Sequence, residues 1–302
     1  PAVFDIARQL ETQPESDAST FTALTEAQNQ ADDLLYQLFV DSFALQTADQ
    51  AASAPVHQLF YHRLTGGRMD RFYGDGTAIA LPDGSHQLGE VFQIQWKING
   101  INFEDTLAVI IERAIRLLNP SQAGYSIIGH GDAHNGNVFF NETRRLLTYF
   151  DPAFAGQHHP LLDLTKPLFH NVFAMWMYFP QEERERLKIS LHIDGQNRWR
   201  VEHNYHLNPV RQMFLRSKVD RTLIPVLQYM KKQEILRNDW GAYLKAALFC
   251  CPFLTMDLKR FPREIALLGL TMAIEMGAES GVDDMGNRSV IDSVLDEAEQ
   301  AL

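Results

Sequence analysis

The chain has 302 residues, a formal net charge of −11, 45% hydrophobic residues and 22% charged residues. A chain of this length and composition can bury a sizeable core. Its acidic balance argues against a nucleic-acid partner, because phosphate binding needs clusters of Lys and Arg. The same charge is compatible with a cationic small-molecule substrate.

The apolar runs fall short of the roughly 20 residues that a membrane span needs, and no signal-peptide pattern opens the chain. We therefore expect no membrane partner. The only cysteines, Cys250 and Cys251, are neighbours in sequence and cannot form a disulfide framework. This cysteine usage predicts a reducing, cytoplasmic setting.

The beginning of the chain is predicted to pass from helices to strands. Residues 1–55 indicate leading helices, and the clearest covers 21–45 with apolar residues at helical spacing. Residues 56–103 indicate a segment of strands and turns. Within it, 77–81 and 91–96 flank Pro82-Asp83-Gly84, which predicts a hairpin.

An amphipathic helix is predicted next, over 103–118, with Asn102 as a cap candidate and Asn119-Pro120 as its stop. It leads into a short apolar run at 125–128 that predicts a strand. This order of elements brings the chain to its most informative stretch.

That stretch is His-Gly-Asp-Ala-His-Asn-Gly-Asn at 130–137, followed by apolar runs at 138–140 and 147–150 on either side of a polar turn. The runs predict a β-hairpin. If the hairpin is symmetric about Arg144, Asn137 lies opposite Asp151, and opposed Cα atoms in an antiparallel pair are roughly 4.5–5.5 Å apart. Two oxygen donors at that spacing can share one Mg²⁺. A separate carboxylate on the loop, Asp132, would then be free for a proton, as phosphoryl transfer requires.

The motif resembles the catalytic loop of the aminoglycoside phosphotransferase and choline kinase family, a branch of the protein-kinase-like fold. The resemblance rests on His-Gly-Asp-x-His-x-x-Asn, on the apolar hairpin ending in Asp, and on a continuation through Gly156, Pro160 and Asp163-Leu164. It implies an α+β fold that is mainly α, built on a kinase-like C-terminal lobe with small β-hairpins. It also implies a kinase that moves the γ-phosphate of ATP to a hydroxyl of a small molecule.

The resemblance assigns roles to six residues of the motif and its continuation. Asp132 would be the catalytic base. Asn137 and Asp151 would hold Mg²⁺ and, with His134, the ATP co-substrate. His130 would brace the loop, and Asp163 would hold the loop backbone or line the acceptor pocket.

One departure from the family concerns the nucleotide-binding lobe. A kinase-like fold carries a lysine for the ATP phosphates beneath a Gly-rich loop, but the first lysine here is Lys97, and no Gly-x-Gly-x-x-Gly precedes it. We therefore predict that the N-terminal nucleotide lobe is missing from this sequence, and we expect the intact protein to carry it ahead of Pro1. Arg63, Arg68 and Arg71 form the first basic cluster, and we interpret it as a solvated or salt-bridged face rather than a phosphate contact.

The remainder is predicted to be largely helical. A hairpin insertion is expected around Asp194-Gly195, and residues 209–278 indicate three helices. The predicted organisation is a kinase-like lobe over 1–278, made of leading helices (1–55), a strand and turn segment (56–103), a catalytic core (104–170) and a helical substrate region (171–278), followed by an acidic tail (279–302).

Two other interpretations stay open. The chain could be a non-catalytic, pseudokinase-like binding protein that keeps the loop as architecture. Alternatively His130, Asp132 and His134 could form a transition-metal site, although this leaves Asn137 and Asp151 without a role.

Overall fold

The computed structural model describes residues 1–13, 18–195 and 197–302. Its α-helices are α1 (Val3–Thr12), α2 (Ala18–Ser42), α3 (Ala48–Ala52), α4 (Tyr61–Thr65), α5 (Gly67–Tyr73), α6 (Leu88–Val91), α7 (Leu107–Leu117), α8 (Pro160–His170), α9 (Met175–Tyr178), α10 (Pro180–Arg186), α11 (Pro209–Lys218), α12 (Ile224–Lys232), α13 (Trp240–Leu254), α14 (Arg263–Gly277) and α15 (Val290–Ala301). Short 3₁₀ helices are η1 (Pro55–Leu59), η2 (Asn135–Asn137) and η4 (Leu258–Arg260), and a π-helical turn, η3 (Val219–Leu223), joins α11 to α12.

The strands are short and form four small sheets within the described residues. They are β1 (Ala44–Gln46), β2 (Ala78–Leu81), β3 (Gly84–Gln87), β4 (Gln95–Ile98), β5 (Ile101–Phe103), β6 (Gly124–Gly129), β7 (Val138–Asn141), β8 (Leu146–Tyr149), β9 (Gly156–His158), β10 (Ile189–Ile193) and β11 (Arg198–His203). The sheet orders are β1-β6-β9, β10-β11-β4-β5, β2-β3 and β7-β8. The structure thus confirms a mainly helical fold with small β-hairpins.

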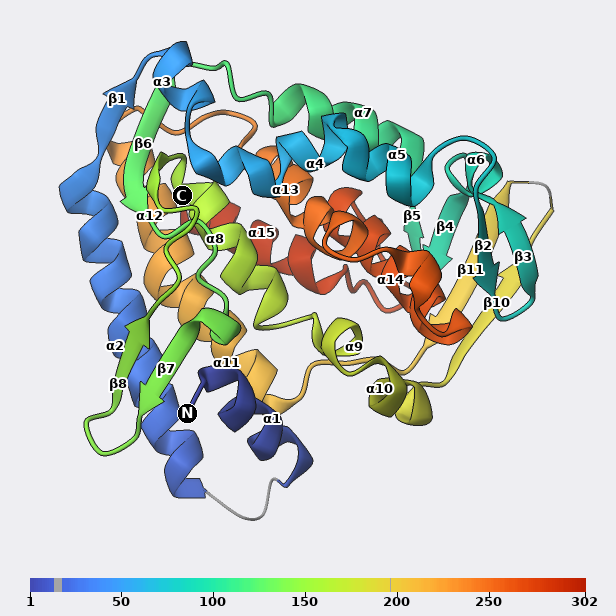
Figure 1. Cartoon of the computed structure of the whole chain (residues 1–302), viewed down its shortest axis with the longest axis horizontal. Coiled ribbons are helices and arrows are strands. Elements are labelled where there is room, and N and C mark those ends of the chain that lie inside the picture. Colours follow the sequence, from blue (N-terminus) through green and yellow to red (C-terminus); the bar gives the residue numbers. More distant parts are fainter. Residues whose placement is uncertain (14–17, 196) are drawn as a thin grey trace.

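Figure 1 shows how these elements are arranged. The long helix α2 runs along one side, and the hairpin β7-β8 lies beside it, near the N-terminus. Helices α8, α13 and α14 fill the centre, while β2, β3, β4, β5, β10 and β11 gather at the opposite end. Every residue of α8 is buried, as expected of a helix that is covered on all sides. One hydrophobic core contains residues from Val3 to Ala298.

Several predicted elements are confirmed. The helix predicted over 21–45 is α2, and the hairpin insertion is β10-β11, with Ile189 opposite His203. The three helices predicted over 209–278 are α11 continued through η3 into α12, then α13 and then α14. The predicted helix over 103–118 is α7, but it begins at Leu107, where the Thr106 side chain accepts a hydrogen bond from the Val109 N–H. Asn102 lies in β5 instead of capping the helix.

Two predictions in the segment 56–103 are wrong. Residues 55–73 form the helical elements η1, α4 and α5 rather than strand and turn, because Val56, Leu59, Phe60 and Leu64 fall on one helical face and are all buried. The hairpin does turn at Pro82-Asp83, but its second strand is Gly84–Gln87 and not 91–96. A two-residue turn pairs the residues that follow it at once.

Two further comparisons concern residues 279–302 and the apolar segment that contains α13. Residues 279–302 are predicted from sequence as an acidic tail with a short amphipathic end at 290–302, and that end is confirmed as α15, which buries Ile291, Val294 and Ala298 in the common core. Within the described chain, one helical segment, Trp240–Arg260, is long and apolar enough for a membrane span. The expectation that all apolar segments are too short for a span is therefore wrong. However, 72% of its most apolar window is buried inside the protein, as for a core helix.

Candidate active site

The loop 130–137 connects β6 to β7 and is held from both sides by buried polar groups. His130 ties it to the hairpin: its Nε2–H donates to the Phe150 carbonyl at 2.9 Å, while its Nδ1 accepts from the Asp132 N–H at 3.4 Å. Both ring nitrogens are therefore used within the protein. This leaves His130 no free nitrogen for a metal ion.

On the other side, Asp163 at the start of α8 holds the loop backbone. Its Oδ1 accepts from the Gly131 N–H at 2.6 Å and from the His158 Nε2–H at 3.0 Å. Burial pushes the pKa of Asp163 upward, but the hydrogen bond and charge of His158, with the Gly131 N–H, leave that pKa below its ordinary value. The carboxylate is therefore ionised at neutral pH and braces the loop.

Two glycines make this bracing possible. Gly131 has φ +79°, and a Cβ there would lie 2.5 Å from the Phe154 carbonyl oxygen. A Cβ on Gly129 would lie 2.5 Å from Asp163 Oδ1. Since neither approach leaves room for a side chain, these positions require glycine.

The hairpin places Asn137 and Asp151 together, but in a register that differs by one residue from the predicted one. Val138 pairs with Tyr149, and the Phe150 N–H donates to the Asn137 carbonyl at 3.0 Å. Asn137 therefore lies opposite Phe150, and Asp151 follows on the next residue with φ +58°. The assumed symmetry about Arg144 is wrong because the turn is one residue tighter, with Arg145 at φ +49°.

Asn137 also fixes the proposed catalytic residue. Its Nδ2 donates to the Asp132 carbonyl at 3.0 Å, which leaves its amide oxygen for another partner. An amide oxygen and the Asp151 carboxylate are the hard oxygen donors that Mg²⁺ prefers, so this donor set fits the ion. Among the described residues no group of three or more His, Cys, Asp and Glu side chains could hold a metal ion. This finding disfavours the transition-metal interpretation of His130, Asp132 and His134.

The Asp132 side chain is 18% exposed, and its Oδ1 is buried without a hydrogen-bond partner in the described protein. Two cationic or potentially cationic groups stand near it at more than hydrogen-bond distance. Lys166 Nζ lies 4.0 Å from Oδ1, and His134 Nε2 lies 3.9 Å from Oδ2. Asp132 therefore has an oxygen available for a proton.

His134 is held as a neutral ring. Its Nδ1 accepts from the Gly136 N–H at 3.1 Å, and burial lowers its pKa, with Asp132 acting in the opposite direction. The proton on a neutral ring of this orientation is on Nε2, which faces Asp132.

Lys166, His170 and Arg63 belong to the same site and were not predicted. Lys166 is 3% exposed and donates to His170 Nε2 at 3.3 Å, and His170 Nδ1–H donates to the Tyr178 hydroxyl at 2.7 Å. Their sequence signal is a Lys and a His at i+3 and i+7 from Asp163 on an otherwise apolar helix. Arg63, interpreted from sequence as part of a solvated or salt-bridged face, is half-buried and donates to Thr255 Oγ1 at 3.3 Å.

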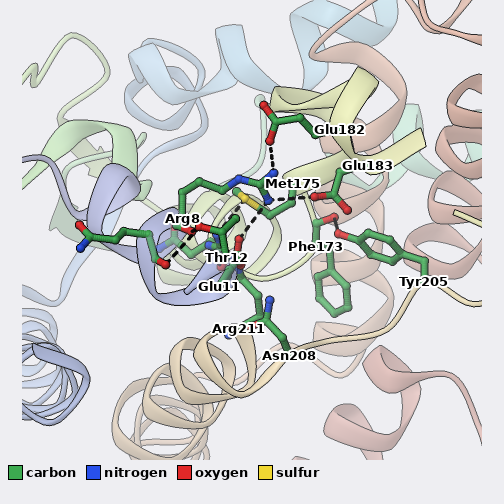
Figure 2. A network of polar contacts seen from close by, with 12 residues as sticks. Arg8, Glu11, Thr12, Phe173, Met175, Glu182, Glu183, Tyr205, Asn208 and Arg211 are labelled. Carbon is green, nitrogen blue, oxygen red and sulfur yellow. Dashed lines mark hydrogen bonds and ion pairs between the residues drawn. The ribbon is translucent and has the colours of Figure 1, made fainter. Parts of the chain in front are cut away.

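A buried polar chain outside the loop links it to the first helix. The Asn135 N–H donates to Asn171 Oδ1 at 2.7 Å, and the Asn171 carbonyl accepts from Arg211 Nη1 at 2.9 Å. Arg211 is also ion-paired with Glu11 of α1. Figure 2 shows this pair together with Arg8, which bridges Glu182 and Glu183 of α10. The loop 130–137 is thus supported by α1, α10 and α11.

Residues 10–201, more than half of the chain, match the phosphotransferase enzyme family (APH). The chain belongs to this family. The resemblance seen in the motif is therefore confirmed, and the matched range contains the loop, the hairpin and Asp163. No curated protein and no solved structure matches the chain.

Membership of the phosphotransferase enzyme family implies a kinase-like fold and makes the chain a phosphotransferase at the general level. The absence of a nucleotide-binding lobe and the cytoplasmic location stay predictions. Lys97, the first lysine of the chain, lies on β4, at the opposite end of the molecule from β7-β8 (Figure 1). It therefore does not stand in for the phosphate-binding lysine of the family.

Proposed function

We propose that this phosphotransferase moves the γ-phosphate of ATP to a hydroxyl group of a small molecule. One observation carries the proposal. The unpartnered Asp132 carboxylate oxygen lies on the same loop as Asn137, at the hairpin end that also carries Asp151. Phosphoryl transfer uses one carboxylate to accept the proton of the attacking hydroxyl and a pair of oxygen donors to hold the metal ion.

In this proposal each residue has one task. Asp132 orients the acceptor hydroxyl and takes its proton as the acceptor oxygen bonds to the γ-phosphorus. The bond from that phosphorus to the bridging oxygen breaks, and ADP leaves. Asn137 holds the Asp132 backbone through Nδ2, and its oxygen with Asp151 would hold Mg²⁺, which when bound neutralises charge on the phosphates.

His134 completes the polar wall beside Asp132. Because its ring is neutral, it offers a hydrogen-bond donor to a phosphate oxygen without adding a second full charge to the loop. We therefore place His134 with Asn137 and Asp151 among the residues that contact the nucleotide.

A transfer assay tests the proposal. The full protein is incubated with ATP labelled in the γ-phosphate and with a panel of hydroxylated metabolites, once with Mg²⁺ and once with EDTA. We expect label to pass to at least one alcohol only when Mg²⁺ is present. Transfer that is unchanged by EDTA, or no transfer to any member of a broad panel, overturns the assignment.

The second candidate is a non-catalytic binding protein of pseudokinase type. It is favoured by the position of Lys97 on β4, far from the hairpin in Figure 1. This candidate predicts binding of a small ligand with no transfer in the same assay, so one experiment separates the two functions.

A further inference from the structure

Two cations stand near Asp132, although the chain as a whole is acidic. Lys166 comes from α8 and Arg63 from α4, two elements about a hundred residues apart in sequence. Lys166 Nζ lies 4.0 Å from Asp132 Oδ1. Arg63 is near enough for its charge to lower the pKa of Lys166, after burial, which lowers that pKa most.

The charges in this cluster do not balance. Asp132 is the carboxylate whose charge raises the pKa of both Lys166 and Arg63. The neighbouring thiols do not supply a second negative charge, because burial raises the pKa of Cys251 to about 11 and raises that of Cys250 further. The buried Lys166 ammonium and the half-buried Arg63 guanidinium therefore share the Asp132 carboxylate, and a buried charge without full compensation is costly.

The hydrogen-bond donors of Lys166 and Arg63 are also only partly used. In the described protein Lys166 uses one of its three N–H groups, on His170. Arg63 uses one N–H, on Thr255 Oγ1, and its Nε is buried without a partner. The described protein therefore uses only part of the donor capacity of the two groups, and the buried Asp132 Oδ1 near Lys166 also has no partner.

We propose that the acceptor molecule carries an anionic group, a carboxylate or a phosphate monoester, which binds to Lys166 and Arg63 while its hydroxyl faces Asp132. Such an oxyanion supplies the missing acceptors and the missing negative charge in one group. The proposal rests on the function proposed above and names its substrate class. It replaces the cationic substrate expected from the net charge of −11, because the charged groups that act on Asp132 from α4 and α8 are cations.

The geometry limits the size of the acceptor. The ammonium that binds the anion lies 4.0 Å from the carboxylate that faces the hydroxyl. The two groups must therefore be only a few bonds apart in one molecule, as in a hydroxy acid or a sugar-like phosphate. The chain Lys166–His170–Tyr178 fixes the ammonium in this position, so the site is ordered before the ligand arrives.

Four small alcohols of similar size test the proposal by calorimetric titration of the full protein: glycerol, glycerate, glycerol 3-phosphate and choline. We expect glycerate or glycerol 3-phosphate to bind, and the preferred one identifies the oxyanion. Glycerol and choline should bind at least about tenfold more weakly, since charge-assisted hydrogen bonds are lost. Equal or tighter binding of glycerol or choline, or no binding of either anion, overturns the proposal.

Variants assign the effect to the two cations. Lys166→Met and Arg63→Met should each weaken the bound anion by about tenfold or more, while Lys166→Arg should restore most of the affinity. Arg71→Met is the matched control. Arg71 belongs to the same basic cluster in the sequence as Arg63, but its guanidinium stacks on the Phe72 ring. Circular dichroism checks that each variant is folded.

The γ-phosphate of ATP is also an anion, so Mg-ATP is titrated in parallel. The proposal expects the Kd of Mg-ATP to change by less than about twofold in Lys166→Met. A larger loss of Mg-ATP affinity with unchanged anion binding would assign the cations to the nucleotide and overturn the proposal. Anion binding that persists without any phosphate transfer would overturn the proposed function alone.

Discussion

Two buried lysines in this protein are equally hidden but differ in their surroundings. Lys218 of α11 is ion-paired with Asp32 of α2, and the Asp32 carboxylate also accepts from Ser217 at 2.7 Å and from Gln28 at 2.9 Å. Among the residues that the structure describes, Lys166 of α8 has no carboxylate within hydrogen-bond distance, and its bonded neighbour is a neutral histidine. The exposed fractions of the two side chains are 5% and 3%.

The comparison distinguishes a lysine that stabilises the fold, Lys218, from a lysine at the candidate site, Lys166. Around Lys218 the positive charge is matched by the Asp32 carboxylate, and the ion pair joins α2 to α11. Around Lys166 the charges and the donors exceed what the chain supplies. A buried group that is left incomplete at the catalytic carboxylate indicates a position that a ligand completes.

The largest effect should be on kcat, after substitution of Asp132, the carboxylate closest to Lys166. Asp132→Asn keeps the shape of the side chain but removes the proton acceptor, so kcat should fall by about 10²–10⁴. The melting temperature should fall only modestly, because Oδ1 makes no hydrogen bond within the described protein but its charge lies 4.0 Å from the buried Lys166 ammonium. Labelled phosphate transfer and thermal unfolding measure the two quantities, and an active Asp132→Asn enzyme would remove Asp132 from the mechanism.

The next largest effect concerns stability, and it should be large for Lys218 and small for Lys166. Lys218→Met leaves Asp32 charged and buried without its ion pair, so the free energy of unfolding should fall by about 3–5 kcal/mol. Lys166→Met breaks no close ion pair, and the same free energy should change by less than about 1 kcal/mol or rise. Urea unfolding of both variants gives the comparison. Equal losses would show that the two lysines do not differ as described.

A third variant addresses the link between the two regions. Asn171→Ala removes the acceptor of the Asn135 N–H in the loop, which should cost about 1–3 kcal/mol of stability. Because Asn135 lies two residues from Asn137, we also expect kcat to fall about tenfold with little change in the KM for ATP. Asn119→Ala, in an exposed turn, is the control. A pure stability loss with unchanged kcat would make Asn171 a structural residue only.

The smallest effect concerns pH and a second matched pair, Lys245 and Asp292. Burial raises the pKa of Asp292, but Lys245, Ser280 and Ser289 outweigh it, so the pKa in the folded state lies below its ordinary value. The stability that this carboxylate contributes is therefore present above about pH 4, the unfolded pKa, and is lost as pH falls through the folded pKa. Asp292→Asn should be less stable near pH 6 and should show a shallower loss below pH 4, measured by urea unfolding. A steeper acid loss in the variant would contradict this account.

The sequence predicted the elements whose signals are local. Helical spacing located α2, Asp194-Gly195 located β10-β11, and the spacing of the motif located the catalytic loop together with its family. The register of β7-β8 could not be predicted, because it depends on left-handed backbone at Arg145 and Asp151. Non-glycine residues seldom adopt this conformation, and no sequence pattern announces it.

The part of the site that sequence reasoning missed depends on tertiary contacts. Lys166 resembles any lysine of an amphipathic helix until the structure shows that α8 is buried on all sides. Arg63 lies in a segment predicted as strand, and its position beside α13 follows from packing between distant helices. Under the substrate proposal above, the net charge of the chain does not indicate the charge of the substrate, because it averages over the whole surface.

The most direct test of the account is the binding of Mg-ATP at Asn137 and Asp151, measured by calorimetric titration of the full protein with and without EDTA. We predict binding that requires Mg²⁺ and that Asp151→Ala abolishes, while Asp284→Ala, at an exposed position, binds as the unaltered protein does. Binding of ATP that is equal with and without the metal, and equal in Asp151→Ala, would contradict the account.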